Sequence, residues 1–238
     1  MSRLTVFGLE GIPEVKVGDD VATLIADSAL AGDDTALADG DVIVVTQKIV
    51  SKAEDRLVAV DPDDPLSHKP LVERESVRIL RRRGELIISE TVHGFVCANA
   101  GIDLSNVERG WAALLPVDSD RSARRIRDRL RHLAGVDVGV VISDTFGRTW
   151  RRGVTDVAIG CAGIAGVVDL RGTPDALGRE MQVTEVAVVD EIAAAAELVM
   201  GKSTGIPVAV VRGIDPQWMR AGSVSDEIVR RPQDDLFR

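Results

Sequence analysis

Aromatic side chains are scarce in this 238-residue sequence, which holds four Phe, three Trp and no Tyr. Valine, alanine, leucine and isoleucine must therefore fill the core. Cysteine is almost as rare: Cys97 and Cys161 cannot form a disulfide framework, and each lies among small apolar residues. We therefore predict two buried free thiols, which fits a reducing compartment such as the cytoplasm.

Long apolar runs and an excess of positive charge are also missing. No apolar stretch approaches the length that crosses a bilayer, and the first residues, Met-Ser-Arg-Leu-Thr-Val-Phe, lack the apolar core of a secretion signal. The formal net charge of −9 argues against a non-specific nucleic-acid binder, which needs a positive field. We expect a soluble, cytoplasmic protein with no nucleic-acid or membrane partner. Locally clustered arginines still allow an anionic small substrate.

Several common catalytic motifs are absent. The sequence contains neither the Gly-x-Ser-x-Gly of serine hydrolases nor a dinucleotide-binding glycine fingerprint. Its three histidines, His68, His93 and His132, show no metal-ligand spacing and no triad pattern. The loop 201–205, Gly-Lys-Ser-Thr-Gly, lacks the first glycine of a Walker A motif and follows a predicted helix. We reject that assignment, although the amides of such a loop could still contact phosphate.

What is present is an ordinary globular composition, 45% hydrophobic and 28% charged, in one large domain or two closely packed ones. Apolar periodicity predicts helices at residues 19–31, 71–83, 122–133 and 190–200. Apolar and β-branched runs predict strands at 4–7, 41–46 (continuing through 47–52), 85–89, 95–98, 138–142, 183–189 and 207–211. The elements follow no regular βαβ rhythm, which favours an α+β or complex α/β fold over a doubly wound sheet.

The most informative stretch is residues 138–153, Val-Gly-Val-Val-Ile-Ser-Asp-Thr-Phe-Gly-Arg-Thr-Trp-Arg-Arg-Gly. Its first five residues predict a buried strand that ends at Ser143, Asp144 and Thr145. Three cations follow: Arg148, Arg151 and Arg152. Polar groups at the carboxyl end of a strand are where α/β proteins usually bind substrates, and a carboxylate for a metal beside cations for phosphate indicates nucleotide chemistry. A strand followed by a solvated turn explains the same residues and stays open as an alternative.

A second candidate carboxylate, Asp103, lies in the polar loop 99–107, three residues before Asn106. Asp103 and Asp144 could together hold Mg²⁺, which binds one or two carboxylates plus substrate phosphates. Spacing alone favours an Asx-turn at Asp103. Lys52 could contact phosphate, but a solvated lysine is the commoner case. The arginine-rich helix at 122–133 indicates a solvated face.

Six stretches, taken together and in chain order, match one enzyme family. They are residues 8–13 (Gly-Leu-Glu-Gly-Ile-Pro), 44–54, 99–107, 142–153, 186–195 and 205–213. With these stretches the chain resembles the coenzyme F420-0:L-glutamate ligases (γ-glutamyl ligases), including the N-terminal half of the two-domain actinobacterial enzyme. No single stretch is specific, whereas the set is.

The resemblance implies GTP-dependent ligation of L-glutamate through a γ-linkage onto the deazaflavin coenzyme F420-0, and onto F420-1, by way of an acyl phosphate. It implies Mg²⁺ or Mn²⁺ and K⁺ as cofactors, and a two-part mixed-sheet α+β fold that intertwines as a homodimer. The expected sub-domains are 1–85 plus 183–238, with 86–182 inserted. The flavin-binding half of the fused enzyme has no counterpart in this sequence, so we expect any reductase step to reside elsewhere.

By motif, the resemblance assigns three groups of site residues. The catalytic, metal-binding aspartates would be Asp103 and Asp144, with Thr145 as a further metal ligand. The GTP site would comprise Ile12, Pro13, Glu14, Val15, Gln47, Lys48, Lys52, Asn106, Met200, Gly201, Lys202, Ser203, Thr204, Gly205 and Ile206. The cations that meet phosphate or the anionic tail of the deazaflavin would come from Arg148, Arg151 and Arg152.

Two positions depart from the family pattern. Many archaeal members carry an acidic metal ligand in the loop Met-Gly-Glu-Gly-Gly, whereas Lys202 stands at that position here, in a loop one residue shorter. A second metal would then be held differently, or its charge replaced by the ammonium. Gln47-Lys48 replaces a pair of small hydroxyl residues. Two other functions stay open: a metal-dependent nucleotide phosphohydrolase that uses the same aspartates, and a non-catalytic nucleotide-binding module.

Overall fold

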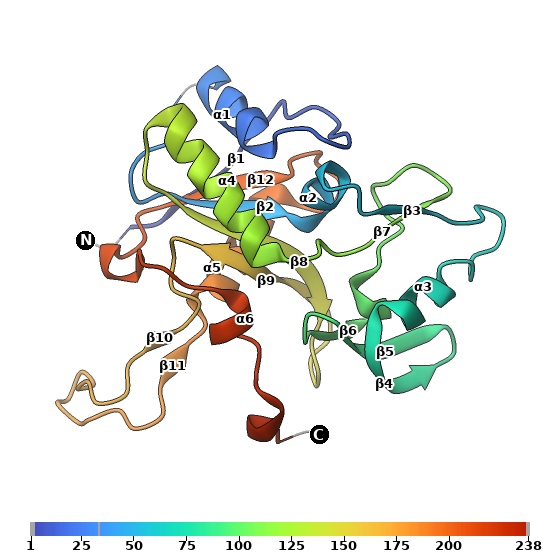
Figure 1. Ribbon diagram of the computed structural model, residues 1–238. Coiled ribbons are helices and arrows are strands. Elements are labelled where there is room, and N and C mark those ends of the chain that lie inside the picture. The colour runs from blue at the N-terminus through green and yellow to red at the C-terminus, as the bar shows by residue number, and fades with distance from the viewer. Residues whose placement is uncertain (1–2, 33, 237–238) are drawn as a thin grey trace.

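The computed structural model describes residues 3–32 and 34–236. Its centre is a five-stranded sheet with the order β1-β12-β2-β8-β9. The strands are β1 (Thr5–Gly8), β12 (Val208–Arg212), β2 (Val42–Thr46), β8 (Gly139–Gly147) and β9 (Val154–Ala162). β2 and β8 run parallel, and the other neighbouring pairs are antiparallel. Helices lie on both faces, so the main body has three layers (Figure 1).

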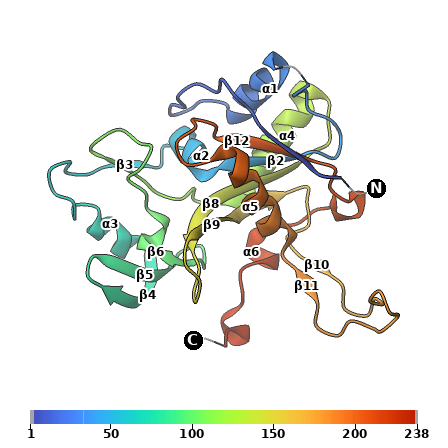
Figure 2. The same ribbon diagram turned by 180° about the vertical axis from the view of Figure 1, so that it is seen from behind.

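The helices α1 (Val21–Ala31) and α4 (Ser119–Ala134) cover one face of this sheet, whereas α5 (Val188–Met200) and α6 (Val224–Glu227) cover the other (Figures 1 and 2). β2 is buried on both sides: Ile43 and Val45 join the core of the α1–α4 face, and Val42 and Val44 join the core of the α5 face. Burial on both faces explains why this strand is an unbroken apolar run in the sequence.

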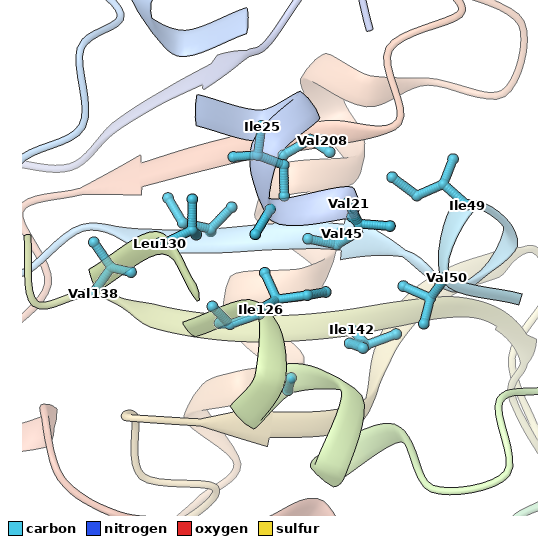
Figure 3. Close-up of a cluster of buried hydrophobic side chains, with 14 of the residues drawn as sticks. Val21, Ile25, Val45, Ile49, Val50, Ile126, Leu130, Val138, Ile142 and Val208 are labelled. Atoms are coloured by element: carbon cyan, nitrogen blue, oxygen red, sulfur yellow. The ribbon is translucent and has the colours of Figure 1, made fainter. Parts of the chain in front are cut away.

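Figure 3 shows the core of the α1–α4 face, where Ile25 from α1 and Ile126 from α4 point toward the sheet. Val45 and Ile142 extend toward them from β2 and β8. These side chains are aliphatic, as the scarcity of aromatic residues predicts. The two cysteines, Cys97 and Cys161, are buried and free, which confirms that prediction.

A smaller unit lies to one side of the main body, at the right of Figure 1. It contains the antiparallel pair β3 (Leu57–Ala59) and β7 (Trp111–Ala113), and a sheet of β4 (Ser76–Arg83), β5 (Leu86–Thr91) and β6 (Val96–Ala98). α3 (Lys69–Arg74) and the short helix η1 (Asn99–Gly101) complete it. Its own core consists of Val72, Ile87, Ala100, Ile102, Ala112 and Leu114.

The remaining elements are α2 (Gln47–Ala53), the paired β10 (Val168–Asp169) and β11 (Glu185–Val186), and the short helices η2 (Pro216–Trp218) and η3 (Pro232–Asp234). This mixture of helices and several sheets confirms the predicted α+β class. None of the described helices is long and apolar enough to cross a membrane. The division into 1–85 plus 183–238 and 86–182 stays a prediction, and strand pairing groups β8 and β9 with β1, β2 and β12.

Most predicted elements are confirmed to within a few residues at each end. They are the helices at 19–31, 122–133 and 190–200 and the strands at 4–7, 41–46, 85–89, 95–98 and 207–211. The prediction that residues 47–52 continue the second strand is wrong, because they form α2. The amide of Thr46 donates to the carbonyl of Pro207, just before β12 begins, and this is the last backbone hydrogen bond on the β12 side of β2. Proline has no amide to return, so the strand ends and the chain turns into a helix.

The helix predicted at 71–83 is also wrong. α3 ends at Arg74, and residues 76–83 form β4, which pairs with β5. Arg83 pairs with Leu86, so Gly84 and Glu85 form a two-residue hairpin turn, and Gly84 has a φ of 55°. Glycine at this position suits a tight hairpin as well as a helix end, and the sequence pattern does not distinguish them.

Two strand boundaries need correction as well. β8 does not end at Ile142 but continues through Gly147, because β9 supplies partners along its length after a register shift between Ile142 and Ser143. Asp144 and Thr145 therefore lie within a strand, opposite Val157 and Asp156. The strand predicted at 183–189 shrinks to Glu185–Val186, since α5 already begins at Val188.

Candidate functional site

Most of the predicted site residues gather at one edge of the central sheet. The parallel strands β2 and β8 reach this edge in register, with Thr46 opposite Ser143. β1 ends and β12 begins at the same edge, where Gly8 pairs with Ala209. The loops 9–15 and 201–207 and the start of α2 therefore converge there, although they are far apart in the sequence.

A cleft of about 990 Å³ opens at this edge. Among the residues assigned by the resemblance, the cleft is lined by Ile12, Pro13, Glu14, Val15, Gln47, Lys48, Lys52, Asp103, Asn106, Asp144, Thr145, Gly201, Lys202, Ser203, Gly205 and Ile206. Asp103 and Asn106 come from the smaller unit, so the main body and the smaller unit both line the cleft.

The side chain of Asp103 uses its two oxygens differently. Oδ1 accepts a hydrogen bond from the amide of Ser105 at 2.7 Å, which is the Asx-turn expected for this loop. Oδ2 lies 2.6 Å from Nζ of Lys48. The backbone of Asp103 is held by two hydrogen bonds with Ala113, the last residue of β7. Burial alone would raise the pKa of Asp103, but hydrogen bonds from Lys48 and Ser105 hold that pKa below its usual range.

Asp144 is the most perturbed carboxyl group that lines the cleft. Burial raises its pKa to about 7, and the neighbouring charges of Asp103 and Asp156 add to this rise. The amide of Thr145 and the ammonium of Lys48 oppose it. A buried carboxylate beside two others is costly unless a cation neutralises it, so the site favours a bound cation.

The two lysines on α2 are both paired with carboxylates across the cleft. Lys48 contacts Asp103, and Lys52 contacts Glu14 in the loop that follows β1. Lys52 is buried, whereas the side chain of Glu14 is 76% exposed. An exposed partner contributes little to stability, so the ammonium of Lys52 can exchange Glu14 for a bound anion at small cost.

Lys202 forms a third ionic group, from the opposite wall. Its Nζ donates to Thr145 Oγ1 at 2.6 Å and to Asp156 Oδ1 at 2.9 Å, and lies 2.7 Å from Glu197 Oε1. Burial alone would lower the pKa of Lys202, but its bonds to Asp156 and Glu197 hold that pKa above its ordinary value. We call this arrangement of Lys202, Thr145, Asp156 and Glu197 the ammonium site.

Asp156 and Glu197 line the cleft but were not found from the sequence. The signal in the sequence was weak. Asp156 is the one acidic residue in the apolar run 154–162, which forms β9. The other lining residues that the sequence-based assignment missed are Thr46, Ile49, Ser105, Val107, Glu108, Ser143, Val154 and Pro207. Of these, all but Glu108 and Val154 lie within the six stretches that carry the resemblance.

Within the part of the chain that the structure describes, the side-chain amide of Gln47 makes a hydrogen bond through its oxygen but not through its nitrogen. Its side chain is buried and its carbonyl oxygen accepts from Ser51 Oγ at 2.8 Å, whereas Nε2 has no hydrogen-bond partner among the described residues. A buried donor without a partner is unfavourable, and this one belongs to a residue that lines the cleft. It can donate to an acceptor on a bound molecule.

Five assigned residues do not line the cleft. Met200 is fully buried in the core of the α5 face, and the hydroxyl of Thr204 bonds the carbonyl of Met200 inside its own loop. Arg148, Arg151 and Arg152 lie on the exposed turn between β8 and β9, where Arg148 donates to the carbonyl of Arg152 at 3.2 Å. Their predicted contacts to phosphate or substrate stay predictions.

The oxygen donors of the cleft suit a hard divalent cation that takes some of its ligands from the protein and the others from a bound substrate. Within residues 3–32 and 34–236, no group of three or more His, Cys, Asp or Glu side chains is arranged to hold a metal. Asp103 and Asp144 supply carboxylate oxygens, and further ligands would have to come from phosphate and water. That division is typical of Mg²⁺ in nucleotide-dependent enzymes.

Comparison with known proteins gives a consistent result. The family model described as F420-0:Gamma-glutamyl ligase matches residues 11–213. Three curated relatives are named coenzyme F420:L-glutamate ligase. The relative from Methanopyrus kandleri is 43% identical over 258 aligned residues that cover both chains completely. Those from Methanothermobacter thermautotrophicus and Archaeoglobus fulgidus are 42% and 41% identical; each covers 99% of this chain, and the chain covers 99% and 97% of them.

Proposed function

The chain belongs to the F420-0:gamma-glutamyl ligase family, and from this premise we propose that it joins L-glutamate through a γ-linkage to coenzyme F420-0, and then to F420-1, with GTP as co-substrate. The observation that supports the proposal best is the cleft itself. It combines two carboxylates suited to a metal with lysines suited to phosphate, at an edge lined by loop amides.

The reaction proceeds in two transfers. The terminal carboxylate of the substrate attacks the γ-phosphorus of GTP, and GDP leaves, which produces an acyl phosphate. The amine of glutamate then attacks the acyl carbon, loses a proton, and releases inorganic phosphate as the amide bond forms. No protein nucleophile is needed, which agrees with the absence of a triad pattern in the sequence.

The residues of the cleft act by positioning and by neutralising charge. Lys48 and Lys52 exchange their carboxylate partners for phosphate oxygens, and Gln47 Nε2 donates to an acceptor on the nucleotide. Asn106 faces the 201–206 loop, since its Nδ2 lies 3.4 Å from the carbonyl oxygen of Lys202. Asp103 and Asp144, with Thr145 beside them, would hold Mg²⁺ or Mn²⁺, which stabilises negative charge on the transferred phosphoryl group.

The family membership also supports three broader proposals: action as an intertwined homodimer, a cytoplasmic location, and a role for K⁺. Analytical ultracentrifugation tests the first, since a protein that sediments as a monomer at the concentrations of the assay would contradict it.

The test of the function is mass spectrometry of F420-0 after incubation with GTP, Mn²⁺ and L-glutamate. Each transfer should raise the mass by one glutamate less water. Phosphate release from GTP without a heavier product would instead indicate a nucleotide phosphohydrolase. Tight GTP binding without metal dependence or turnover would indicate a nucleotide-binding module.

Asp144→Asn should abolish ligation, lowering the rate at least about a thousandfold, because the variant loses one of two carboxylates proposed for the metal. Circular dichroism should show an intact fold. Asp128→Asn, on the exposed face of α4, is the matched control and should ligate at the wild-type rate. Substrate-dependent GDP release near the wild-type rate in Asp144→Asn would disprove the metal-binding role.

A further inference from the structure

The ammonium of Lys202 is surrounded by three oxygens from three different elements. Thr145 belongs to β8, Asp156 to β9 and Glu197 to α5, and their oxygens lie 2.6, 2.9 and 2.7 Å from Nζ. Two of the three are carboxylates. An oxygen set with two negative charges around one point is the type of environment that proteins offer to a cation.

The sheet holds two of these oxygens in place independently of Lys202. Thr145 and Asp156 are directly opposite each other in the β8–β9 pair. The hydroxyl of Thr145 donates to Asp156 Oδ1 at 2.6 Å, and the hydroxyl of Ser143 donates to Asp156 Oδ2 at 3.0 Å. Both hydroxyl groups are neutral, so neither compensates the charge of the carboxylate.

Asp156 depends on Lys202 for that compensation. Its side chain is only 3% exposed, and the ion pair that the described structure records for it is with Lys202. A buried carboxylate without a counter-ion is strongly unfavourable. The side chain of Lys202 itself is 52% exposed, so the cation enters from the solvent side of the cleft.

We propose that Lys202 is a tethered cation, whose ammonium occupies a cation position formed by Thr145, Asp156 and Glu197 and so replaces an ion from solution. An external cation cannot bind Thr145 Oγ1 while an ammonium lies 2.6 Å from that oxygen, because the two positive charges repel at such a distance. Removing the ammonium opens the position to an ion from solution.

The part of this inference that concerns the divalent metal rests on the proposed function and refines it. Thr145 belongs to the ammonium site, which leaves Asp103 and Asp144 as the protein ligands of the divalent ion. The cleft then takes up one divalent ion per chain with nucleotide. The position of the ammonium itself does not depend on which reaction the protein catalyses.

The experiment counts bound Mn²⁺ per chain in the full-length protein, by electron paramagnetic resonance of free Mn²⁺, with and without GDP. The variants are Lys202→Met, which keeps the length of the side chain without its charge, and Lys202→Arg, which keeps the charge. Lys16→Met is the matched control, because it removes the charge of an exposed lysine that does not line the cleft. Thermal melts in KCl and in NaCl of equal concentration test for a monovalent ion.

Wild type, Lys202→Arg and Lys16→Met should bind one Mn²⁺ per chain. Lys202→Met should bind one more Mn²⁺, or gain thermal stability in KCl that the other proteins do not gain, and the additional change Asp156→Asn should remove that gain. Equal Mn²⁺ counts in wild type and Lys202→Met, with no specific effect of KCl, would overturn the inference. A count of none in wild type and one in Lys202→Met would support the tethered cation but disprove metal binding at Asp103 and Asp144.

A measurement on the wild type covers the case in which Lys202→Met does not fold. The ¹⁵N signal of the Lys202 ammonium should persist in slow exchange with water when Mg²⁺ and GDP are saturating. Loss of that signal on addition of Mg²⁺ would show that the metal displaces the ammonium, and the inference would fail.

Discussion

At the scale of single residues, Asp103 shows that a structural role and a site role can belong to one side chain. The loop pattern favours an Asx-turn, and the resemblance favours a metal ligand. The carboxylate makes the turn with Oδ1 and presents Oδ2 to the cleft, where Lys48 pairs with it. The two oxygens are separate acceptors, so the local sequence could not decide between the roles.

Gln47 supports a prediction on nucleotide affinity. Gln47→Met preserves the size of the side chain and removes the unpaired Nε2 donor, so the KM for GTP should rise about tenfold, the effect of one lost hydrogen bond to a ligand. Gln217→Met, at an exposed position outside the cleft, is the control. A KM for GTP that is unchanged in steady-state kinetics of Gln47→Met would show that this amide does not contact the nucleotide.

Gly160 supports a prediction on stability. A Cβ at this position of β9 would lie 2.3 Å from the backbone carbon of Ser119, the first residue of α4. Backbone cannot move aside as a side chain can, so Gly160→Ala should lower the free energy of unfolding by about 3 kcal/mol in urea titrations. Gly147→Ala adds a methyl group to open space and should change it by less than about 0.5 kcal/mol. Equal midpoints for both variants would contradict this account.

At the scale of elements, sequence periodicity succeeded for α1, α4 and α5, which each bury one face against the central sheet, and for β2, which is buried on both faces. It failed at 47–52 and 71–83, which lie beside the cleft and in the smaller unit. At 47–52 the deciding factor is a neighbour, Pro207, which ends the ladder of β2. At 71–83 it is pairing with β5. The first cause is a contact with a residue distant in the sequence, and the second is the pairing of two strands in a hairpin. The apolar pattern of one segment specifies neither.

The start of α1 supports a prediction with a pH dependence. Asp20 Oδ1 accepts from the amides of Ala22 and Thr23, and Oδ2 accepts from Arg129 at 2.8 Å. Asp20→Ala should therefore cost about 1 kcal/mol of unfolding free energy at pH 7. Asp27→Ala, at an exposed position of the same helix, is the control.

The effect of Asp20 should disappear in acid. Burial alone would raise the pKa of Asp20, but hydrogen bonds from Arg129 and Thr23 lower it below 3.8. A lowered pKa in the folded state stabilises the fold above pH 3.8, and this contribution is lost as the pH falls through the folded-state pKa. Urea midpoints of wild type and Asp20→Ala should differ at pH 7, and the difference should shrink as the pH falls below 3.8 and through the folded-state pKa. A difference that does not shrink in acid would rule out the ionised cap.

At the scale of the whole molecule, the chain has two cores on the central sheet and a third in the smaller unit. β2 is buried on both faces, whereas nearly all of β4 is exposed at the edge of a three-stranded sheet. Amides of β4 should therefore exchange with deuterium at least about a hundredfold faster than those of β2. Hydrogen exchange followed by mass spectrometry measures both, and equal protection would show that the two units unfold only together.

The sequence by itself determined the class of the fold, the aliphatic core, the buried thiols and, through a set of matching stretches, most residues of the cleft. These properties depend on which residues a segment contains and on its own periodicity. Only the tertiary structure decided which charges meet: Lys48 with Asp103, Lys52 with Glu14, and Lys202 with Asp156 and Glu197. Such pairs join residues from different strands, helices and loops, so the packing of the sheet, and not any local pattern, brings them within hydrogen-bonding distance.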